Sequence, residues 1–526
     1  MKKEFNTTGV CYPHEHYMMN NNRQLKEVFA LIERGKYFTL NRPRQFGKTT
    51  SLHFLINMLS QKEAYLGIRL TFEDVQGKSH ESEGNFTEMF WKKLERAFRR
   101  KDKHPFNTLK SLPKATNYHE LAETITNLAH ETDKKLVMLI DEVDASTNHI
   151  AFLQFLAMLR SKYLNRYEPQ DKTFHSIVLA GVHDIKSLKY KLRHRDDVEY
   201  NSPWNIATDF KVDMSFKPKE IAPMLEEYSA AEGVAMDIPA IAERLHYHTS
   251  GYPFLVSRLC KIVAEEILPK RENYSDSYQK SWSLKDIEQA VQILLNEDNT
   301  NFGSLIKNLE NHQDLYDLTF RIVIKGSEIA FNVDNPTIRK GILYGAFKRN
   351  GKIKIHNRVY EQRIYNYLAS KVETSIQTDS YSASAEFQLP NGGLNFEKVL
   401  QKFQQFIKEV YSDKQADFLE HQWRVIFMAF IRPIVNGEGY TFKEVETSQE
   451  KRLDIVVTYN TFRYIIELKK WYGNTYHQRG LTQLADYLDI HNLEKGYLVI
   501  FDRKRQEINK AETIKHLGKT ISAVWI

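Results

Sequence analysis

The feature that most constrains the fold of this chain is a short apolar run that leads into a polar turn and then directly into a helix. Residues 37–40 (YFTL) have the composition of a buried strand, residues 42–49 (RPRQFGKT) form the turn, and residues 50–61 carry apolar side chains at helical spacing. A second strand is expected at residues 68–75, and the alternation continues to about residue 184. This pattern predicts an α/β fold, in which helices cover both faces of a mostly parallel sheet.

The chain is too long for one hydrophobic core, because single cores stop growing at about 250 to 300 residues. Its 526 residues therefore predict several domains. The pattern turns helical after the sheet segment, a basic turn precedes a long helix later on, and a Ser- and Thr-rich stretch follows that helix. The predicted divisions are a sheet domain (14–217), a helical lid (218–299), a winged-helix-like module (300–371), a linker (372–395) and a C-terminal α/β domain (396–526).

The first turn ends in Gly47-Lys48-Thr49, which is the end of a phosphate-binding loop motif. In such a P-loop, backbone N–H groups and a helix N-terminus point at the phosphates, the lysine adds charge, and the hydroxyl, here of Thr49, binds Mg²⁺. The first glycine of the motif would fall at position 42, which is Arg42. The tripeptide alone is a weak signal, but the strand before it and the helix after it support a nucleotide site. The residues expected to bind the nucleotide are Arg44, Gln45, Phe46, Gly47, Lys48, Thr49 and Thr50.

A later apolar run, residues 136–140, ends in the acids Asp141 and Glu142. Hydrolysis of a nucleotide needs a carboxylate that helps to hold Mg²⁺ and another that orients or deprotonates the attacking water. We expect Asp141 to assist the metal and Glu142 to act on the water. The alternative is a solvated strand end with ordinary acids, which the order of the two motifs along the chain disfavours.

The segments FTLNRPRQFGKTTSLHFL, LIDEVD, LAGVHDIKSL and SGYPFLVSRLC resemble the AAA-like ATPase domains that occur in bacteria and archaea beside nucleases of the PD-(D/E)XK type. The resemblance covers about residues 14–265 and implies a P-loop, AAA-like domain that binds and hydrolyses ATP with Mg²⁺. In the related signal-transducing (STAND) ATPases, a Gly-x-Pro element lies near the adenine. The resemblance therefore implies that Pro253, in Gly251-Tyr252-Pro253, lies near the base.

His183 and Asp184 occupy the position where these ATPases carry a sensor residue, but they depart from the usual Asn, Ser or Thr. Arg193 and Arg195 are candidates for an arginine finger that reaches the nucleotide of a neighbouring subunit, which would require a homo-oligomer. A solvated loop is the alternative for this polar stretch. The sequence therefore leaves the sensor and the arginine finger unassigned.

A second chemical site is predicted near the C-terminus, in the strand IIELKKW. Alternate residues of a strand lie on one face, so Glu467 and Lys469 are side by side, and Asp454 lies on a preceding strand that TYNTF joins to this one as a hairpin. Carboxylates that hold divalent ions, together with a lysine that orients the water, are what phosphodiester hydrolysis requires. An exposed salt pair is the alternative, but the apolar neighbours of Glu467 make the strand largely buried.

The C-terminal segment, residues 396–526, resembles the PD-(D/E)XK nuclease superfamily through this Asp, Glu-x-Lys set. The helix GLTQLADYLD adds Gln483 and Tyr487, which are four apart and resemble the Q-x-x-x-Y element of RecB-like members. The resemblance implies a catalytic set of Asp454, Glu467, Lys469, Gln483 and Tyr487.

The resemblance also implies a metal site for Mg²⁺, with Mn²⁺ as an alternative ion. Its ligands would be Asp454, Glu467 and Glu420, which resembles the first-helix acid of these nucleases, although Glu444 or Glu446 could take that place. His477 and His491 are not expected to bind metal, because neither has a second ligand at helical spacing.

Composition supports a cytoplasmic protein with a polyanionic partner. No stretch approaches 18 consecutive apolar residues, so no membrane partner is expected, and the two cysteines, Cys11 and Cys260, disfavour a disulfide framework or a zinc cluster. The net charge of +7 agrees with nucleic acid, but only weakly, because it is spread over a large surface.

The sequence therefore supports two alternative functions. The first is an ATPase coupled to metal-dependent cleavage of nucleic acid, with DNA the expected target; the resemblance adds an expectation of defence against phage or mobile DNA. The second is an ATP-switched signalling or scaffold protein whose C-terminal domain binds nucleic acid without cleaving it. The complete Asp454, Glu467 and Lys469 set favours the first.

Overall fold

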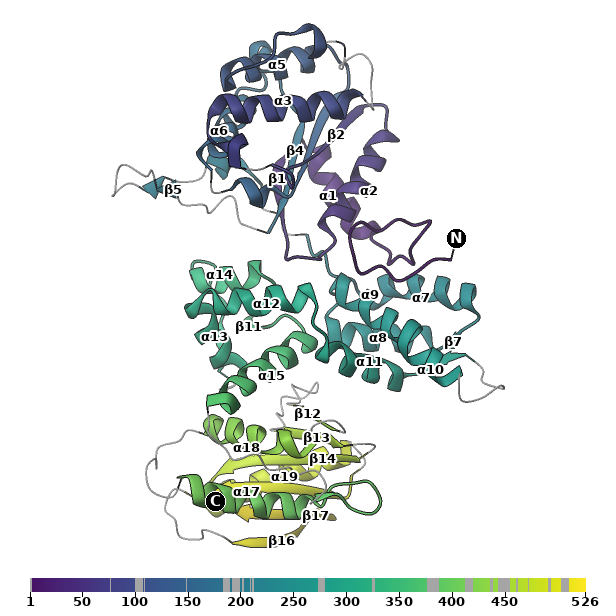
Figure 1. Ribbon diagram of the computed structural model, residues 1–526, viewed down its shortest axis with the longest axis vertical. Coiled ribbons are helices and arrows are strands. Elements are labelled where there is room, and N and C mark those ends of the chain that lie inside the picture. The colour runs from purple at the N-terminus through teal and green to yellow at the C-terminus, as the bar shows by residue number, and fades with distance from the viewer. Residues whose placement is uncertain are drawn as a thin grey trace. The chain divides into compact units, whose positions relative to one another are not determined.

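We examined a computed structural model of the chain, which divides into two compact units, one of residues 1–311, 331–350 and 356–359 and one of the remainder (Figure 1). The residues that the structure describes are 2–75, 77–99, 107, 109–147, 149–182, 190–191, 199–200, 203–208, 210, 212–272, 280–323, 327–375, 387–411, 420–435, 439–442, 455–459, 462–471, 473–490, 493–502 and 510–526. Among them, no helix is both long and apolar enough to cross a membrane.

The N-terminal part of the first unit is built on a parallel four-stranded sheet, which confirms the predicted α/β class. The strand order is β1-β4-β3-β2, and Thr208 adds an isolated parallel bridge to Phe38 of β1. The second strand was expected at residues 68–75 but lies earlier, because the chain turns after Thr71, where the Val75 N–H donates to Phe72. The strands are β1 (Tyr37–Asn41), β2 (Tyr65–Thr71), β3 (Lys135–Asp141) and β4 (Ser176–Gly181).

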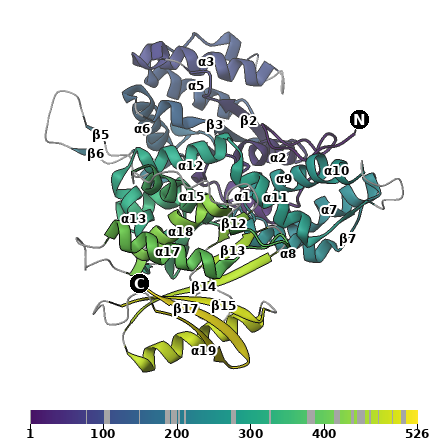
Figure 2. The ribbon, with the colours of Figure 1, turned by 60° about the horizontal axis from the view of Figure 1, so that its bottom comes forward.

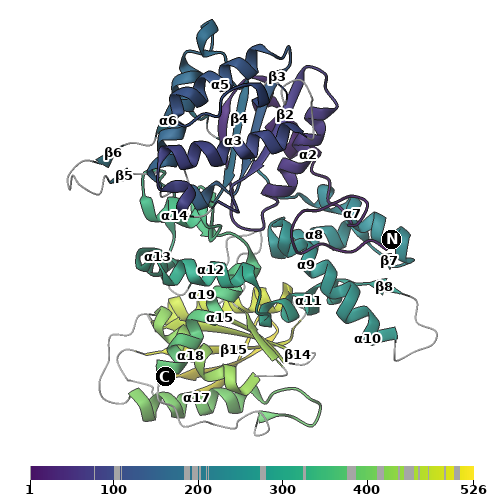
Figure 3. The same cartoon turned by 45° about the horizontal axis from the view of Figure 1, so that its top comes forward.

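Helices cover both faces of this sheet because its strands are apolar on both sides. Alternate residues such as Ile68, Met138 and Leu179 pack with α3, α5 and α6 in one large core, and α1 and α2 lie on the other side of the strands (Figures 1 and 3). The bounds are α1 (Asn22–Glu33), α2 (Lys48–Ser60), α3 (Glu83–Arg99), α5 (Tyr118–His130) and α6 (Ile150–Leu164). Short 3-10 turns occupy η1 (Gly77–His80), η2 (Val143–Ser146), η3 (Pro169–Asp171) and η5 (Pro203–Ile206), and β5 (Tyr190–Lys191) pairs with β6 (Glu199–Tyr200).

The lid segment is mostly helical, as predicted. It departs from that prediction at β7 (Ala235–Met236), which pairs in parallel with β8 (Ser281–Trp282), because Gly233 ends the preceding helix in a left-handed conformation. The helices are α7 (Pro218–Glu232), α8 (Ile238–Thr249), α9 (Pro253–Ile262), the π-helical turn η6 (Val263–Ile267), α10 (Leu268–Glu272) and α11 (Leu284–Asn296).

The boundary between the two units runs through the segment predicted as a winged-helix-like module, so that module remains a prediction. The first unit takes α12 (Thr300–Glu310), α14 (Pro336–Leu343) and β10 (Phe347–Asn350). The second takes α13 (Gln313–Val323), β9 (Ile329–Ala330), β11 (Lys352–Ile355) and most of α15 (Arg358–Ser375). Gly351 has a left-handed φ of +69° between β10 and β11, and β11 pairs antiparallel with β9.

The predicted linker is shorter than expected at its N-terminal end, because α15 continues to Ser375. Residues 376–386 lie outside the described part of the chain. The stretch from residue 387 is ordered by an isolated bridge between Gln388 and Leu394.

The second unit carries a mixed six-stranded sheet, in the order β12-β13-β14-β15-β17-β16. The neighbours β14, β15 and β17 are parallel and the other pairs antiparallel. Helix α19 packs on one face, and α17 and α18 lie on the other (Figure 2). The bounds are α17 (Phe396–Tyr411), α18 (Glu420–Val435), β12 (Gly439–Phe442), β13 (Ile455–Tyr459), β14 (Phe462–Lys470), α19 (Asn474–Ile490), β15 (Lys495–Phe501), β16 (Ala511–His516) and β17 (Lys519–Trp525).

Candidate functional site

The loop between β1 and α2 has the backbone that a phosphate site needs. Gly47 stands directly before α2 with a φ of +78°, and Gln45 is also left-handed, with a φ of +55°. A residue with a side chain would be strained at Gly47. The predicted strand, turn and helix are thus confirmed, and the helix begins at Lys48, so that the N–H groups of its first turn have no partner within the helix.

The Lys48 side chain folds back over this loop. Its Nζ donates to the carbonyl oxygens of Arg42 at 2.9 Å and Pro43 at 3.0 Å. Burial lowers the pKa of Lys48, while the nearby carboxylates of Glu142 and Asp144 act in the opposite direction. The loop therefore holds an ammonium group at the N-terminus of α2, where it can meet an anion.

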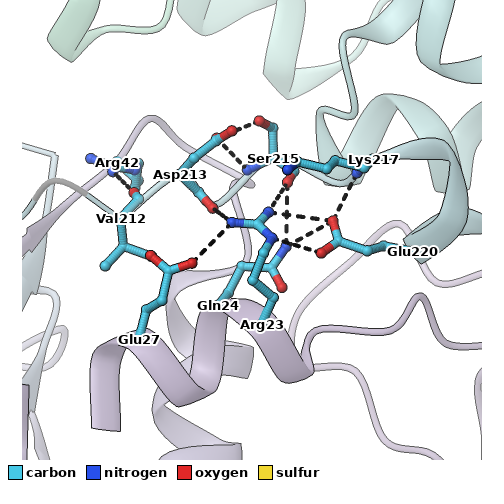
Figure 4. A network of polar contacts seen from close by, with 9 residues as sticks. All are labelled: Arg23, Gln24, Glu27, Arg42, Val212, Asp213, Ser215, Lys217 and Glu220. Carbon is cyan, nitrogen blue, oxygen red and sulfur yellow. Dashed lines mark hydrogen bonds and ion pairs between the residues drawn. The ribbon is translucent and has the colours of Figure 1, made fainter. Parts of the chain in front are cut away.

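Arg42, in the place of the usual first glycine, turns away from the loop. Its guanidinium donates to the carbonyl oxygens of Asn41 and Val212 and lies 4.8 Å from the ring of Phe210. Burial lowers the pKa of Arg42 to about 10. The arginine thus ties the loop to the segment that leads into the lid (Figure 4).

The same segment is held by Arg23 of α1. Its guanidinium donates to the carbonyl oxygens of Asp213 at 2.9 Å and Ser215 at 3.0 Å and forms an ion pair with Glu220 at 2.8 Å (Figure 4). Because Glu220 belongs to the first turn of α7, this network fastens the sheet domain to the start of the lid. Sequence reasoning did not find it, since its members lie almost 200 positions apart.

The acid pair stands at the end of β3, as predicted, with Asp141 as its last residue and Glu142 directly after it. Asp141 is 1% exposed and accepts from Arg69 at 3.2 Å and from the Glu142 backbone N–H at 3.1 Å. Burial raises the pKa of Glu142, Lys48 opposes that shift, and Asp141 and Asp144 add to it. Glu142 has a φ of +54°, a strained conformation for a residue with a side chain, which sets it at a sharp turn after the strand. Asp144 accepts from the Val182 N–H at 2.6 Å and so joins the ends of β3 and β4.

The Gly251-Tyr252-Pro253 element does reach the loop. Tyr252 Oη donates to the carbonyl oxygen of Arg44 at 2.5 Å, and its ring meets the buried ring of Phe46 edge-on at 4.6 Å. Gly251 has a φ of +71°, and an added Cβ would lie 2.0 Å from the Phe216 carbonyl oxygen, so no larger residue fits there. Pro253 follows as the first residue of α9.

A contact that sequence reasoning missed lies beside the same loop. Gly345, just after α14, has a φ of +77°, and an added Cβ would lie 2.5 Å from Pro43 Cγ. The His356 ring lies 5.9 Å from that of Phe46 and 5.5 Å from that of Tyr252. A left-handed Gly after a helix is a common helix end, so the local sequence carries no sign that it packs on the phosphate loop.

The other residues predicted to bind the nucleotide differ in their contacts. Thr49 is half-buried in the first turn of α2, and the Thr50 hydroxyl accepts from the Cys11 N–H at 3.2 Å. Gln45 donates to the hydroxyl of Thr300, the first residue of α12, at 3.3 Å. The sensor and arginine-finger candidates at positions 183, 184, 193 and 195 lie outside the described residues.

In the second unit, Glu467 and Lys469 lie on β14 in the middle of the mixed sheet, as predicted. Glu467 is 0% exposed, and Lys469 Nζ lies 2.7 Å from its Oε1. The alternate residue Ile465 packs with α19, so all three side chains belong to the face that this helix covers. An exposed salt pair on a solvent face is therefore excluded.

Helix α19 brings the other predicted residues to this face. An added Cβ on Gly480 would lie 3.6 Å from Lys469 Cγ, so the helix passes close to the lysine. Tyr487 is buried in the core cluster between helix and sheet, and Gln483 is half-buried one turn earlier. The helix begins at Asn474, earlier than the expected Gly480.

The other predicted metal ligands are only partly described. Asp454, Glu444 and Glu446 lie outside the described residues, although Ile455, directly after Asp454, pairs with Ile466, directly before Glu467. Glu420 begins α18, on the face opposite α19, and its side chain is not described. The described residues contain no group of three His, Cys, Asp or Glu side chains that could hold a metal ion.

The His477 ring packs among aromatic side chains. Its ring lies 5.4 Å from that of Trp471 and 6.0 Å from that of Trp525, and burial lowers its pKa. His491 lies outside the described residues.

Comparison with known proteins bears on the first site. Residues 26–189 match the family described as "Predicted AAA-ATPase". A search of curated proteins found no match. The chain is similar to the solved Aeropyrum pernix ORC2 protein (ADPNP-ADP complexes), with 12% identity over 70% of this chain and 98% of that one and a TM-score of 0.37. It is also similar to the Thermotoga maritima RuvB Holliday junction branch migration motor, with 14% identity, 69% and 98% coverage and a TM-score of 0.33.

TM-scores this low carry no conclusion about this chain, so the assignment rests on the family match and on the loop itself. The matched segment contains the strand, the left-handed Gly47, the buried Lys48 and the acid pair after β3. It ends before the lid and does not reach the second unit. Residues 26–189 are therefore a P-loop ATPase domain of the AAA-like kind.

Proposed function

We propose that this chain couples ATP binding and hydrolysis in its first unit to metal-dependent cleavage of nucleic-acid phosphodiester bonds, with DNA the expected target, in its second. In the first site, Lys48 exchanges its bonds to loop carbonyls for bonds to phosphate oxygens. Thr49 and Asp141 supply oxygen donors, the ligand type that Mg²⁺ prefers. Glu142 orients or deprotonates water, and its raised pKa makes it the better proton acceptor.

Residues 44–50 would cradle the nucleotide through their backbone N–H groups, with Arg44, Gln45, Phe46, Gly47 and Thr50 as its nearest neighbours. Pro253 would lie near the base. The contact of Tyr252 with Arg44 and Phe46 supports this placement, because it joins the Gly-x-Pro element to the loop.

The single observation that carries the nuclease proposal is the fully buried Glu467 carboxylate beside the Lys469 ammonium on a central strand. Burying a charged pair costs free energy that apolar residues of the same size would not cost, so a functional reason for keeping it is favoured. Glu467 would hold a divalent ion together with Asp454, whose neighbour Ile455 pairs with Ile466, and Lys469 would orient the water. Glu420 begins a helix on the opposite face of the sheet, so it is the least supported of the predicted ligands. A bound Mg²⁺ or Mn²⁺ would supply Lewis acidity at the scissile phosphate.

Gln483 and Tyr487 would act on the substrate from α19. Their helix passes within van der Waals reach of Lys469, which supports a role beside the ion pair. Because they would orient the substrate, their loss should be milder than the loss of the carboxylates.

The ion pair also supports the second function, an ATP-switched scaffold protein. In that case the two charges neutralise each other as part of the core, and the C-terminal domain binds nucleic acid without cutting it. The two functions differ in one measurable property, which is cleavage.

The test is cleavage of plasmid and single-stranded DNA by the purified chain with Mg²⁺, Mn²⁺ or Ca²⁺, with and without ATP. Asp454→Asn, Glu467→Gln and Lys469→Ala should each abolish cleavage, and combining them should cost little more, as expected for residues that act as one unit. Ca²⁺ should support cleavage poorly.

Glu512→Gln is the matched control, because Glu512 lies on the edge strand β16 of the same sheet and pairs with Lys510. It should cleave as wild type does. Unchanged ATP hydrolysis in all variants would show that the first unit is intact. No cleavage by the wild-type chain under any of these conditions would leave the scaffold function; cleavage that persists in Asp454→Asn combined with Lys469→Ala would place the centre elsewhere.

A further inference from the structure

A hollow of about 460 Å³ opens at the edge of the ATPase sheet opposite the nucleotide loop. It is lined by residues at the amino ends of parallel strands, including Gly35 before β1, Lys135 at the start of β3 and His175 before β4. The nucleotide loop and the acid pair follow the carboxyl ends of β1 and β3. Because β3 has seven residues at about 3.3 Å each, the two sites lie about 20 Å apart.

The hollow is strongly basic. Its lining includes five Lys and Arg side chains and a single carboxylate, that of Asp133. Within the described part of the chain, no ion pair joins any of these five cations to a carboxylate. The cations are Arg34, Lys134, Lys135, Arg166 and Lys172.

The charge of these cations also affects the pKa of a neighbouring histidine. The pKa of His175 is lowered by burial and further by Lys135 and Arg166. Cations that line one hollow without carboxylate partners repel one another, and the repulsion is relieved when a polyanion binds. The hollow therefore has the charge of a phosphate-binding surface and lacks the internal partners of a structural ion-pair network.

An aromatic ring stands at the rim. Tyr167 is 84% exposed, and the guanidinium of Arg166 lies 4.6 Å from its ring and 4.0 Å from that of Tyr163. Arg166 also donates to the Tyr163 carbonyl oxygen at 2.6 Å, so the arginine is held in place. An exposed ring backed by a fixed arginine is a platform on which an unpaired base can stack.

We propose that this hollow, with Tyr167 at its rim, binds single-stranded nucleic acid, the cations holding backbone phosphates and the tyrosine stacking on a base. Charge alone would accept any polyanion, but the exposed ring favours a strand with unpaired bases over a duplex or polyphosphate. The inference places a nucleic-acid contact on the ATPase domain itself. It does not depend on cleavage in the second unit, because binding can be measured without divalent metal.

The experiment measures binding of fluorescein-labelled oligodeoxythymidine to the full chain in EDTA, with oligouridine, duplex DNA and inorganic polyphosphate as competitors. Lys135→Glu combined with Lys172→Glu should weaken binding at least tenfold and flatten its salt dependence, by about 0.7 in the log–log slope for each lost phosphate contact. Tyr167→Ala should weaken it about fivefold or more and Tyr167→Phe should not, because phenylalanine keeps the stacking ring.

Lys26→Glu combined with Lys285→Glu is the control, since both lysines are exposed, lie on α1 and α11, and give the same change in net charge. Ultraviolet crosslinking followed by mass spectrometry should place an adduct on the peptide that contains Tyr167. Equal loss in both double variants, equal competition by polyphosphate with no effect of Tyr167→Ala, or no adduct on this peptide would each overturn the proposal.

Discussion

Substitution of Gly345 by alanine tests how closely the phosphate loop depends on the segment after α14. The left-handed φ of +77° costs a residue with a side chain about 1–2 kcal/mol. The new Cβ would lie 2.5 Å from Pro43 Cγ and 2.9 Å from its Cβ, and a proline ring cannot swing aside, so overpacking adds about 1–3 kcal/mol. We therefore expect the free energy of unfolding of the first unit to fall by about 2–5 kcal/mol.

Gly233→Ala is the matched control, because Gly233 is also left-handed, at a φ of +65°, but an added Cβ would meet nothing within 4 Å. It should show the backbone cost alone. Thermal unfolding followed by scanning calorimetry measures both, at about 1–2 °C per kcal/mol for a unit of more than 300 residues.

The same pair of variants separates packing from nucleotide binding. The Pro43 carbonyl oxygen accepts a hydrogen bond from Lys48, so a displaced Pro43 should misplace the lysine and weaken ATP binding about fivefold, as measured by titration calorimetry. Gly233→Ala should leave ATP affinity unchanged. Equal effects of the two substitutions on both stability and affinity would refute the reasoning.

Three further outcomes follow from the site. Lys48→Ala and Thr49→Ala should each weaken ATP·Mg²⁺ binding at least tenfold by calorimetry, and unchanged affinity in both would remove the P-loop as the binding site. Glu142→Gln should bind ATP normally but hydrolyse it at least a hundredfold more slowly, because it keeps the shape and loses the base; wild-type turnover would assign that role elsewhere. Desolvation and the nearby Lys348 lower the pKa of His356 to about 4, below its unfolded value of about 6.5, so the neutral ring contributes stability above that range that is lost as the pH falls through it. His356→Gln should therefore reduce the loss of melting temperature between pH 7 and pH 4, and an unchanged pH dependence would show that the histidine does not titrate in the folded protein.

Much of the first unit could be predicted because local chemistry decides it. Apolar strands that are buried on both faces differ in composition from exposed loops. The strand, turn and helix around Gly47 follow one another at the spacing that a P-loop requires. The β13–β14 hairpin and the Glu467, Lys469 pair were predicted for the same reason, since the period of two in a strand puts both side chains on one face. Strands β16 and β17 were missed. The residues of β16, the edge strand, alternate between exposed and half-buried, which is a weak signal, whereas β17 lies inside the sheet and is largely buried, so its apolar residues could have predicted it.

The basic turn shows where local chemistry misleads. Its cations look free in the sequence, but Lys348 donates to the Ser250 hydroxyl at 2.9 Å, Arg349 lies 5.4 Å from the Phe331 ring, and Lys352 pairs with Glu328. Ser250 belongs to the lid segment, so the Lys348 ammonium already has a partner within the first unit. Charge in a sequence does not say whether a partner is already present within the fold.

What remained beyond prediction is how the phosphate loop is held, because its supports come from distant parts of the chain. Arg42 is a departure from the motif when the sequence is considered alone, yet its guanidinium bonds the loop to Val212, at the entrance to the lid. Pro43 meets Gly345 on the other side. Lys48 donates to the carbonyl oxygens of these same two residues, Arg42 and Pro43. If a phosphate accepts these hydrogen bonds from Lys48 instead, the Arg42 and Pro43 carbonyl oxygens both lose a partner. Bound nucleotide should therefore first change the structure at two places, the lid entrance and the segment after α14.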